Sequence, residues 1–205
     1  MNDAQIPLDI EGARRFHGHS CPGLSMGIRV AEIALREIGP HSADEEVVCI
    51  TEADHCAVDA IQYLTGCTVG KGNLIHRDHG KSVFTFIRRS DDKAVRISAR
   101  PDFWGKPDPK EREIFDRMRA DQPISDEDRR YFRQSREARI QAILDAPLED
   151  LFEVRQVEID MPDKARILTS TVCTECGEAT MATRVRYFRG QPYCIPCFEA
   201  LTLEQ

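Results

Sequence analysis

The chain lacks any long hydrophobic run, and its N-terminus lacks a basic start followed by an apolar stretch. A membrane-spanning helix needs about 20 consecutive apolar residues, so none is expected. The opening sequence MNDAQIPLDIEG does not have the organisation of a secretory signal peptide. We therefore expect a cytoplasmic protein.

Cysteine is absent from residues 68–172, although the chain contains eight cysteines. They divide evenly between the first third and the end of the chain: Cys21, Cys49, Cys56, Cys67, Cys173, Cys176, Cys194 and Cys197. In a reducing compartment, this number favours metal ligation or catalysis over a disulfide framework. The gap predicts two separate domains, which we place at residues 1–166 and 167–205.

The sequence also lacks the signatures of several cofactor and nucleotide sites. Neither the four-cysteine ferredoxin spacing nor a nicotinamide or flavin fingerprint is present, so the chain is not a catalytic redox subunit by itself. The Gly70-Lys71-Gly72 loop is not a Walker motif and is either a plain turn or a weaker anion-binding loop. A net charge of −7 disfavours a large nucleic-acid-binding surface.

Helical and extended patterns follow one another irregularly along the first domain. Helices are expected near residues 8–16, 22–38, 56–65, 109–120 and 125–145, and strands near 47–51, 82–89, 93–100 and 151–159. Ser20 is expected to cap the second helix, with Pro22 in its first turn. Because no regular strand–helix–strand rhythm is visible, we predict an α+β fold with a short antiparallel or mixed sheet flanked by helices.

Two Cys-x-x-Cys pairs near the C-terminus are separated by seventeen residues. Four thiolates at this spacing suit tetrahedral Zn²⁺. Gly177 follows the first pair, as a tight metal-binding knuckle often requires. A hairpin turning at residues 189–191 is expected between the pairs, and the second pair opens a short helix. This order predicts a treble-clef zinc finger with a structural zinc, because four protein ligands leave no open position.

The segment FHGHSCPG, residues 16–23, is the second candidate site. His17, His19 and Cys21 are spaced by two residues, and an extended segment would project them to one side. Imidazole and thiolate both bind late first-row metals. Cys21 would also stand at a helix N-terminus, where the dipole lowers a thiol pKa. The alternative is that these are ordinary loop histidines beside a buried first-turn cysteine.

The stretch EADHCAVDAIQ can supply the other half of this site. Cys56 follows a predicted strand and opens a predicted helix, again a location that favours a thiolate. Asp54, His55 and Asp59 are further candidate ligands or proton carriers, although Asp54 is equally suited to cap the helix. Cys67, at the start of the glycine-rich loop, is a further candidate thiol. Two histidines and one cysteine would leave a coordination position open, as catalytic metals need.

Taken together, these motifs resemble the FmdE family, which is named after formylmethanofuran dehydrogenase. The similar stretches lie within roughly residues 10–160 and read FHGHSCPGLSMGIRVAEIAL, CAVDAIQYLTGCTVGKGNL and HGKSVFTF. The family's motif residues fall on His17, His19, Cys21, Cys56, Asp59, Gln62, Cys67, Lys71 and Asn73.

The resemblance implies an α+β core, commonly a homodimer, with a metal-binding active site. Some family members also carry a C-terminal treble-clef zinc finger. The family is named for its association with a molybdenum or tungsten enzyme of methanogenesis that reduces CO₂ onto methanofuran. That association implies a link to one-carbon metabolism, and it leaves the role of the FmdE protein itself open.

Residues and resemblance together predict two metals. The finger is expected to hold a structural Zn²⁺, and the core a second transition metal, which we take to be Zn²⁺. The predicted core ligands are His17, His19 and Cys56, with Cys21 or Cys67 as an additional thiol. The candidate catalytic residues are Cys56, His19, Cys21, Asp59 and Lys71, the last two acting by orienting ligands or substrate.

Three classes of function stay open at this point. The first is an enzyme that uses a metal-activated water or a low-pKa thiolate. The second is an accessory or metal- and cofactor-handling subunit of a molybdenum or tungsten oxidoreductase. The third is a zinc-finger regulator that binds nucleic acid, which the acidic balance of the chain disfavours.

Overall fold

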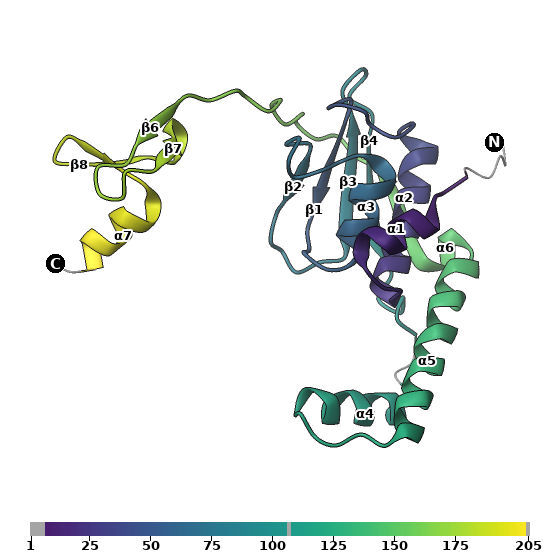
Figure 1. The fold of residues 1–205 in the computed structure, drawn as a ribbon. Coiled ribbons are helices and arrows are strands. Elements are labelled where there is room, and N and C mark those ends of the chain that lie inside the picture. Colours follow the sequence, from purple (N-terminus) through teal and green to yellow (C-terminus); the bar gives the residue numbers. More distant parts are fainter. Residues whose placement is uncertain (1–6, 106–107, 204–205) are drawn as a thin grey trace. The chain divides into compact units, whose positions relative to one another are not determined.

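The computed structural model describes residues 7–105 and 108–203, and the chain divides into two compact units, residues 1–164 and 165–205 (Figure 1). The helices of the first unit are α1 (Ile10–His17), α2 (Pro22–Glu37), α3 (Ala57–Thr65), α4 (Pro109–Arg119), α5 (Asp126–Asp145) and α6 (Leu148–Leu151). Its strands are β1 (Val47–Thr51), β2 (Leu74–His76), β3 (Val83–Arg88), β4 (Ala94–Ala99) and β5 (Phe152–Gln156). The predicted α+β fold is confirmed.

The five strands form one mixed sheet in the order β2-β1-β3-β4-β5. Strand β1 pairs in parallel with β2, and the remaining neighbours are antiparallel. The predicted hairpin joins β3 to β4 and turns with Asp92 at a φ of 55°. Strand β2 was not predicted, because three residues of which only Leu74 is buried carry no readable alternation.

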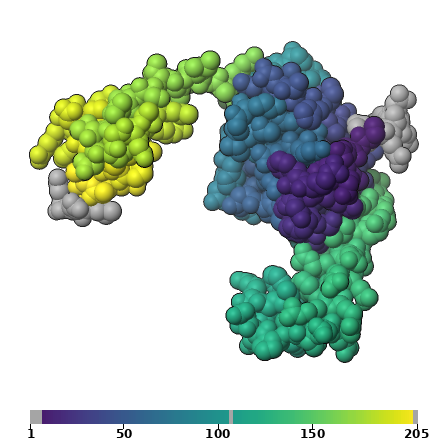
Figure 2. Space-filling view, viewed as in Figure 1, coloured from purple at the N-terminus to yellow at the C-terminus, as the bar shows by residue number. Residues whose placement is uncertain are grey.

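Helices α2 and α3 cover one face of the sheet and enclose the main core. Phe84 and Phe86 of β3 are fully buried there, together with Val95 and Ile97 of β4. Helix α1 packs on α2 and α3, and the space-filling view shows it, in purple, on the outside of the core (Figure 2). The N-terminal end of α3 and the C-terminal end of α1 are therefore positioned by the same helix layer.

The other face of the sheet is covered by chain that follows β5. Val157, Ile159 and Met161 pack, partly buried, against a small cluster of Ile50, Ile87 and Ala94. The strand predicted to reach residue 159 ends at Gln156, since the residues beyond it turn onto the sheet face.

Helices α4 and α5 form a charged hairpin, as the sequence predicts. Ser125 caps α5, because its side chain accepts a hydrogen bond from the backbone N–H of Asp128. The rings of Phe115 and Phe132 stack between the two helices at 6.3 Å.

The second unit contains β6 (Ser170–Val172), β7 (Ala179–Met181), a 3₁₀ turn η1 (Ala182–Arg184), β8 (Arg186–Phe188), β9 (Gln191–Tyr193) and α7 (Ile195–Leu203). Strands β8 and β9 form the hairpin predicted between the two cysteine pairs, and α7 follows as predicted. Within the described residues of both units, no helix combines the length and hydrophobicity that crossing a bilayer requires.

Candidate metal centres

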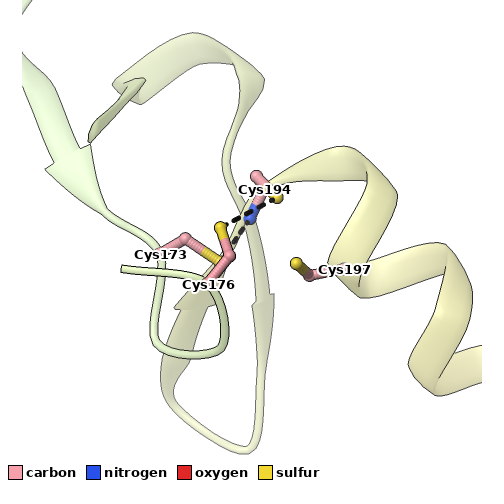
Figure 3. Close-up of side chains that lie close together, drawn as sticks. All are labelled: Cys173, Cys176, Cys194 and Cys197. Carbon is pink, nitrogen blue, oxygen red and sulfur yellow. Dashed lines mark hydrogen bonds between the residues drawn. The ribbon is translucent and has the colours of Figure 1, made fainter. Parts of the chain in front are cut away.

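The four C-terminal cysteines converge on one point, and we call them the finger cluster: Cys173, Cys176, Cys194 and Cys197. One sulfur from each lies within 4.8 Å of the others (Figure 3). The sulfurs of Cys176 and Cys194 are 3.9 Å apart. A tetrahedral Zn²⁺ with bonds of about 2.3 Å places its sulfurs about 3.8 Å apart, so the donor set and its spacing fit zinc.

The first cysteine pair lies on a tight knuckle. Gly177 adopts a φ of 73°, which favours glycine, and its N–H donates to the carbonyl of Cys173. The backbone N–H of Cys194 donates to the Cys173 sulfur at 3.3 Å. Hydrogen bonds from the backbone of Cys176 and Cys194 lower the pKa of the Cys173 thiol to about 6. The fold of the knuckle therefore favours one ligating thiolate before any metal arrives.

The other thiols repel one another when ionised. The neighbouring Cys194 thiol is the largest cause that raises the pKa of Cys197 to about 12, and the pKa of Cys176 is raised as well. A divalent cation among the four sulfurs would offset this repulsion, which is the electrostatic basis of a Cys₄ zinc site.

The first unit contains a second cluster of donors, which we call the core cluster: His17, Cys21 and Cys56. One ligand atom from each lies within 4.8 Å of the others. His17 is the last residue of α1, while Cys21 and Cys56 immediately precede α2 and α3. Three helix ends thus deliver one donor each to the same place.

Cys21, and not Ser20, caps α2. Its backbone is extended, with a φ of −150°, and its sulfur accepts from the Leu24 N–H at 3.3 Å. Pro22 occupies the first turn, as predicted. The expectation for Ser20 is corrected because the sequence suits either residue as a cap, and packing buries Cys21 against the helix layer.

Asp59 orients His17 toward the two sulfurs. Its carboxylate accepts a hydrogen bond from His17 Nδ1 at 2.7 Å. Nδ1 therefore carries the proton, and the free lone pair on Nε2 lies 3.7 Å from the Cys21 sulfur. A tetrahedral zinc bound by both atoms would separate them by about 3.6 Å. A carboxylate behind a ligating imidazole is the usual support of a zinc-bound histidine.

The Cys56 thiol does not have the low pKa expected from its place before a helix. Burial is the largest cause that raises its pKa, followed by the hydrogen bond and the charge of the neighbouring Cys21. This corrects the expectation of a free low-pKa thiolate. Two thiols held together in a partly buried place instead suit a cation, which would stabilise both as thiolates.

His19 is placed beside the core cluster but outside the group of three donors. Its ring lies 4.4 Å from that of His17, and the residue is exposed. The 17–21 segment is not uniformly extended, because His17 still belongs to α1 and Gly18 ends that helix at a φ of 91°. That bend explains why alternate residues do not share one side.

Cys67 and Lys71 lie in another part of the first unit. Cys67 is fully buried, its sulfur donates to the Val47 carbonyl at 3.5 Å, and burial raises its pKa to about 11. Lys71 Nζ donates to the carbonyls of Ser42 and Ala43 at 2.8 and 3.3 Å. In this arrangement both residues hold loops together, and the Lys71 ammonium is already occupied by two backbone acceptors.

Two residues near Cys56 have structural contacts of their own. His55 Nδ1 accepts from the Ala57 N–H at 3.3 Å, which leaves Nε2–H for the Ser82 hydroxyl at 3.2 Å. Burial lowers the pKa of His55. Asp54 is exposed, and the residue at the cap position of α3 is Cys56, so the capping role considered for Asp54 is not observed.

One contact that holds α1 in place was not foreseen from any pattern in the sequence. Tyr63 of α3 donates its hydroxyl to Asp9 at 2.7 Å, and Asp9 also accepts from the Gly12 N–H. An aspartate ahead of a helical pattern could have signalled the cap. The partner on α3 is remote in sequence, so only the fold identifies it.

Replacing Asp59 with asparagine is expected to weaken metal binding at the core cluster by about 10- to 100-fold, as loss of a ligand's supporting partner usually does. The amide cannot accept the Nδ1 proton with the strength of a carboxylate, so the His17 ring loses its fixed orientation. Competition titration with a zinc indicator measures the change. Asp78→Asn, an exposed position in the loop before β3, is the matched control. Equal affinities in the two variants would contradict a supporting role for Asp59.

Comparisons with known proteins agree with this division of the chain. The family model described as FmdE, molybdenum formylmethanofuran dehydrogenase operon, matches residues 16–153. A second model, the prokaryotic dksA/traR C4-type zinc finger, matches residues 166–202.

Two individual proteins are similar over most of the chain. A probable S-adenosyl-L-methionine-binding protein from Archaeoglobus fulgidus is 35% identical over 180 residues, which are 85% of this chain and 49% of that protein. The chain thus spans about half the length of this curated relative. The crystal structure of an FmdE-like protein of the tungsten formylmethanofuran dehydrogenase type, from Syntrophus aciditrophicus, has the same fold, with a TM-score of 0.59 and 24% identity over 93% of this chain and 90% of that one. With the family match over residues 16–153 and the C4 finger match at the end, the chain belongs to the FmdE family and carries a C-terminal zinc finger.

Proposed function

We propose that this protein uses the core cluster to hold a transition metal of the Zn²⁺ type with one coordination position open to a small ligand. The observation that carries the proposal is the convergence of His17, Cys21 and Cys56 from three helix ends, within 4.8 Å. Three protein donors, where the finger has four, are what distinguishes a ligand-binding metal site from a structural one.

The surroundings of the three donors support this use. Cys21 is buried, and the His17 side chain is 10% exposed, so two donors are held firmly inside the helix layer. Asp59 fixes the imidazole while its own side chain stays 39% exposed. A bound metal would supply Lewis-acid polarisation of its fourth ligand. Within reach of that ligand, exposed His19 and the Asp59 carboxylate are groups that can take or give a proton.

A second candidate is a non-catalytic accessory subunit that handles metal or cofactor for a molybdenum or tungsten oxidoreductase. The family description, which refers to a molybdenum formylmethanofuran dehydrogenase operon, favours it. Under this candidate the purified protein shows no turnover alone and is isolated together with oxidoreductase subunits. Turnover by the purified chain would favour the enzymatic use of the same site.

Metal analysis of three forms of the full chain tests the proposal. We expect two metal equivalents in the wild type and one in the His17→Ala, Cys56→Ala double variant. A Cys173→Ser, Cys176→Ser double variant should also retain one, from the other site. A single equivalent in the wild type that the His17→Ala, Cys56→Ala variant keeps would refute the core site while leaving the finger intact.

S-adenosylmethionine, the ligand in the name of the Archaeoglobus relative, is the first small molecule to titrate against this chain. Calorimetric binding to the wild type that the His17→Ala, Cys56→Ala variant loses would support a ligand at the open position. Equal binding by both forms would locate it elsewhere, and no binding would assign it to the half of the relative that this chain does not share.

A further inference from the structure

Two glycines of α2 face the start of α3 at the core cluster. Gly23 and Gly27 are four residues apart and so lie on one side of the helix. Helix α2 packs along α3, and the closest approach of the two backbones falls at Cys56 and Ala57, the residues that open α3.

Gly27 permits direct contact between the two backbones. A Cβ at this position would lie 2.2 Å from the Ala57 carbonyl oxygen and 2.6 Å from the Ala57 Cα. These are main-chain atoms, which cannot rotate away as a side chain can. Any larger residue must therefore push the start of α3, with Cys56, away from α2.

Gly23 leaves room for the Cys56 side chain. A Cβ at position 23 would lie 3.0 Å from the Cys56 Cβ and 3.7 Å from its sulfur, and also 3.9 Å from the Cys21 sulfur. A methyl group here would stand against both thiols. Because only a side chain has to adjust, the strain is smaller than at Gly27.

We propose that Gly23 and Gly27 are positioning residues that set the separation between the Cys21 and Cys56 thiols, and thereby the metal affinity of the core cluster. The inference rests on the proposed function in taking the cluster as a metal site. It goes beyond that function by assigning the site's geometry to helix packing, because neither glycine can contact the metal through a side chain.

The main test is Co²⁺ titration of the full-length chain carrying Cys173→Ser and Cys176→Ser, so that the intact core cluster competes for the ion. Adding Gly27→Ala is expected to weaken Co²⁺ binding by about 10- to 100-fold, the range seen when ligand orientation is lost. The thiolate-to-cobalt absorption band should also shift. Gly23→Ala is expected to have a smaller effect of the same kind.

Gly70→Ala is the matched control. A Cβ at Gly70 would meet nothing within 4 Å, and its φ is not in the left-handed range, so no change is expected. Alanine favours a helix more than glycine does, so weaker binding in the α2 variants is not an effect of helix propensity. Wild-type affinity and spectrum in both Gly23→Ala and Gly27→Ala would overturn the proposal.

A metal-independent measurement separates this proposal from the proposed function. Dibromobimane joins two neighbouring thiols, and peptide mass mapping identifies the Cys21–Cys56 linkage. We expect its yield to fall in Gly27→Ala, and an unchanged yield would overturn the positioning role even if the wild-type core bound no Co²⁺. If Trp104 fluorescence shows that Gly27→Ala does not fold, Gly23→Ala decides the outcome in both measurements.

Discussion

The Cys173→Ser, Cys176→Ser double variant is expected to lose one equivalent of zinc together with the folded state of residues 165–205. Each strand of this unit has only three residues. Among residues 165–202, whose side chains the structure describes, only Cys173 and Val185 are buried. Domains below roughly 40 residues usually need a metal or disulfides to fold. Structural zinc contributes about 10–16 kcal/mol in such fingers, far more than this small core can replace.

Zinc content and the amide NMR spectrum measure this effect in the full chain. The signals of residues 165–205 should collapse to random-coil positions, while the first unit keeps its dispersed spectrum. Cys49→Ala is the matched control, because Cys49 is buried in β1 outside both clusters and its loss should leave both metals in place. A double variant with full zinc content and a folded tail would refute the Cys₄ assignment.

Replacing Asn73 with alanine is expected to lower the free energy of unfolding of the first unit by about 3–5 kcal/mol. The Asn73 side chain is completely buried. Its amide nitrogen donates to the carbonyls of Val47 and Asp44, at 2.9 and 3.2 Å, and its oxygen accepts from the Thr68 N–H at 2.9 Å. Each buried group left without a partner costs about 1–3 kcal/mol.

Urea unfolding followed by the fluorescence of Trp104, the only tryptophan of the chain, reports on the first unit alone. Asn73→Asp should be at least as damaging, because it keeps the acceptor but places a carboxylate beside buried carbonyls. Ser98→Ala is the control, since this half-exposed hydroxyl makes only a long 3.5 Å bond to the Glu153 carbonyl. An Asn73→Ala midpoint equal to that of Ser98→Ala would contradict the structural role of Asn73.

Elements with strong local signals were predicted closely. The buried run at β1, the β3–β4 hairpin and the Ser125 cap of α5 each depend on residues adjacent in sequence. Strand β2 was missed, because its pairing with β1 is set by the sheet and not by its own three residues. The Ser20 cap was predicted wrongly for a related reason. Two neighbouring residues suited the position, and burial of Cys21 against α3 decided between them.

The two metal sites differ in how far the sequence could specify them. The finger ligands form two local pairs with fixed spacing, so the chain itself identifies all four. The core cluster combines α1, α2 and α3, and sequence spacing alone grouped His17 with His19. The left-handed turn at Gly18 instead leaves His19 beside the group, while helix packing brings Cys21 to Cys56.

The sequence by itself determined the α+β class, the Cys₄ finger and the segments from which a second site could be built. Each of these follows from local periodicity, local spacing or a quoted motif. Only the tertiary structure decided which donors meet, that Asp59 orients His17, and that Cys67 and Lys71 hold loops elsewhere. The physical reason is that donor convergence depends on how closely α2 can approach α3. The backbone contact at Gly27 sets that approach, and no pattern along the chain reports it.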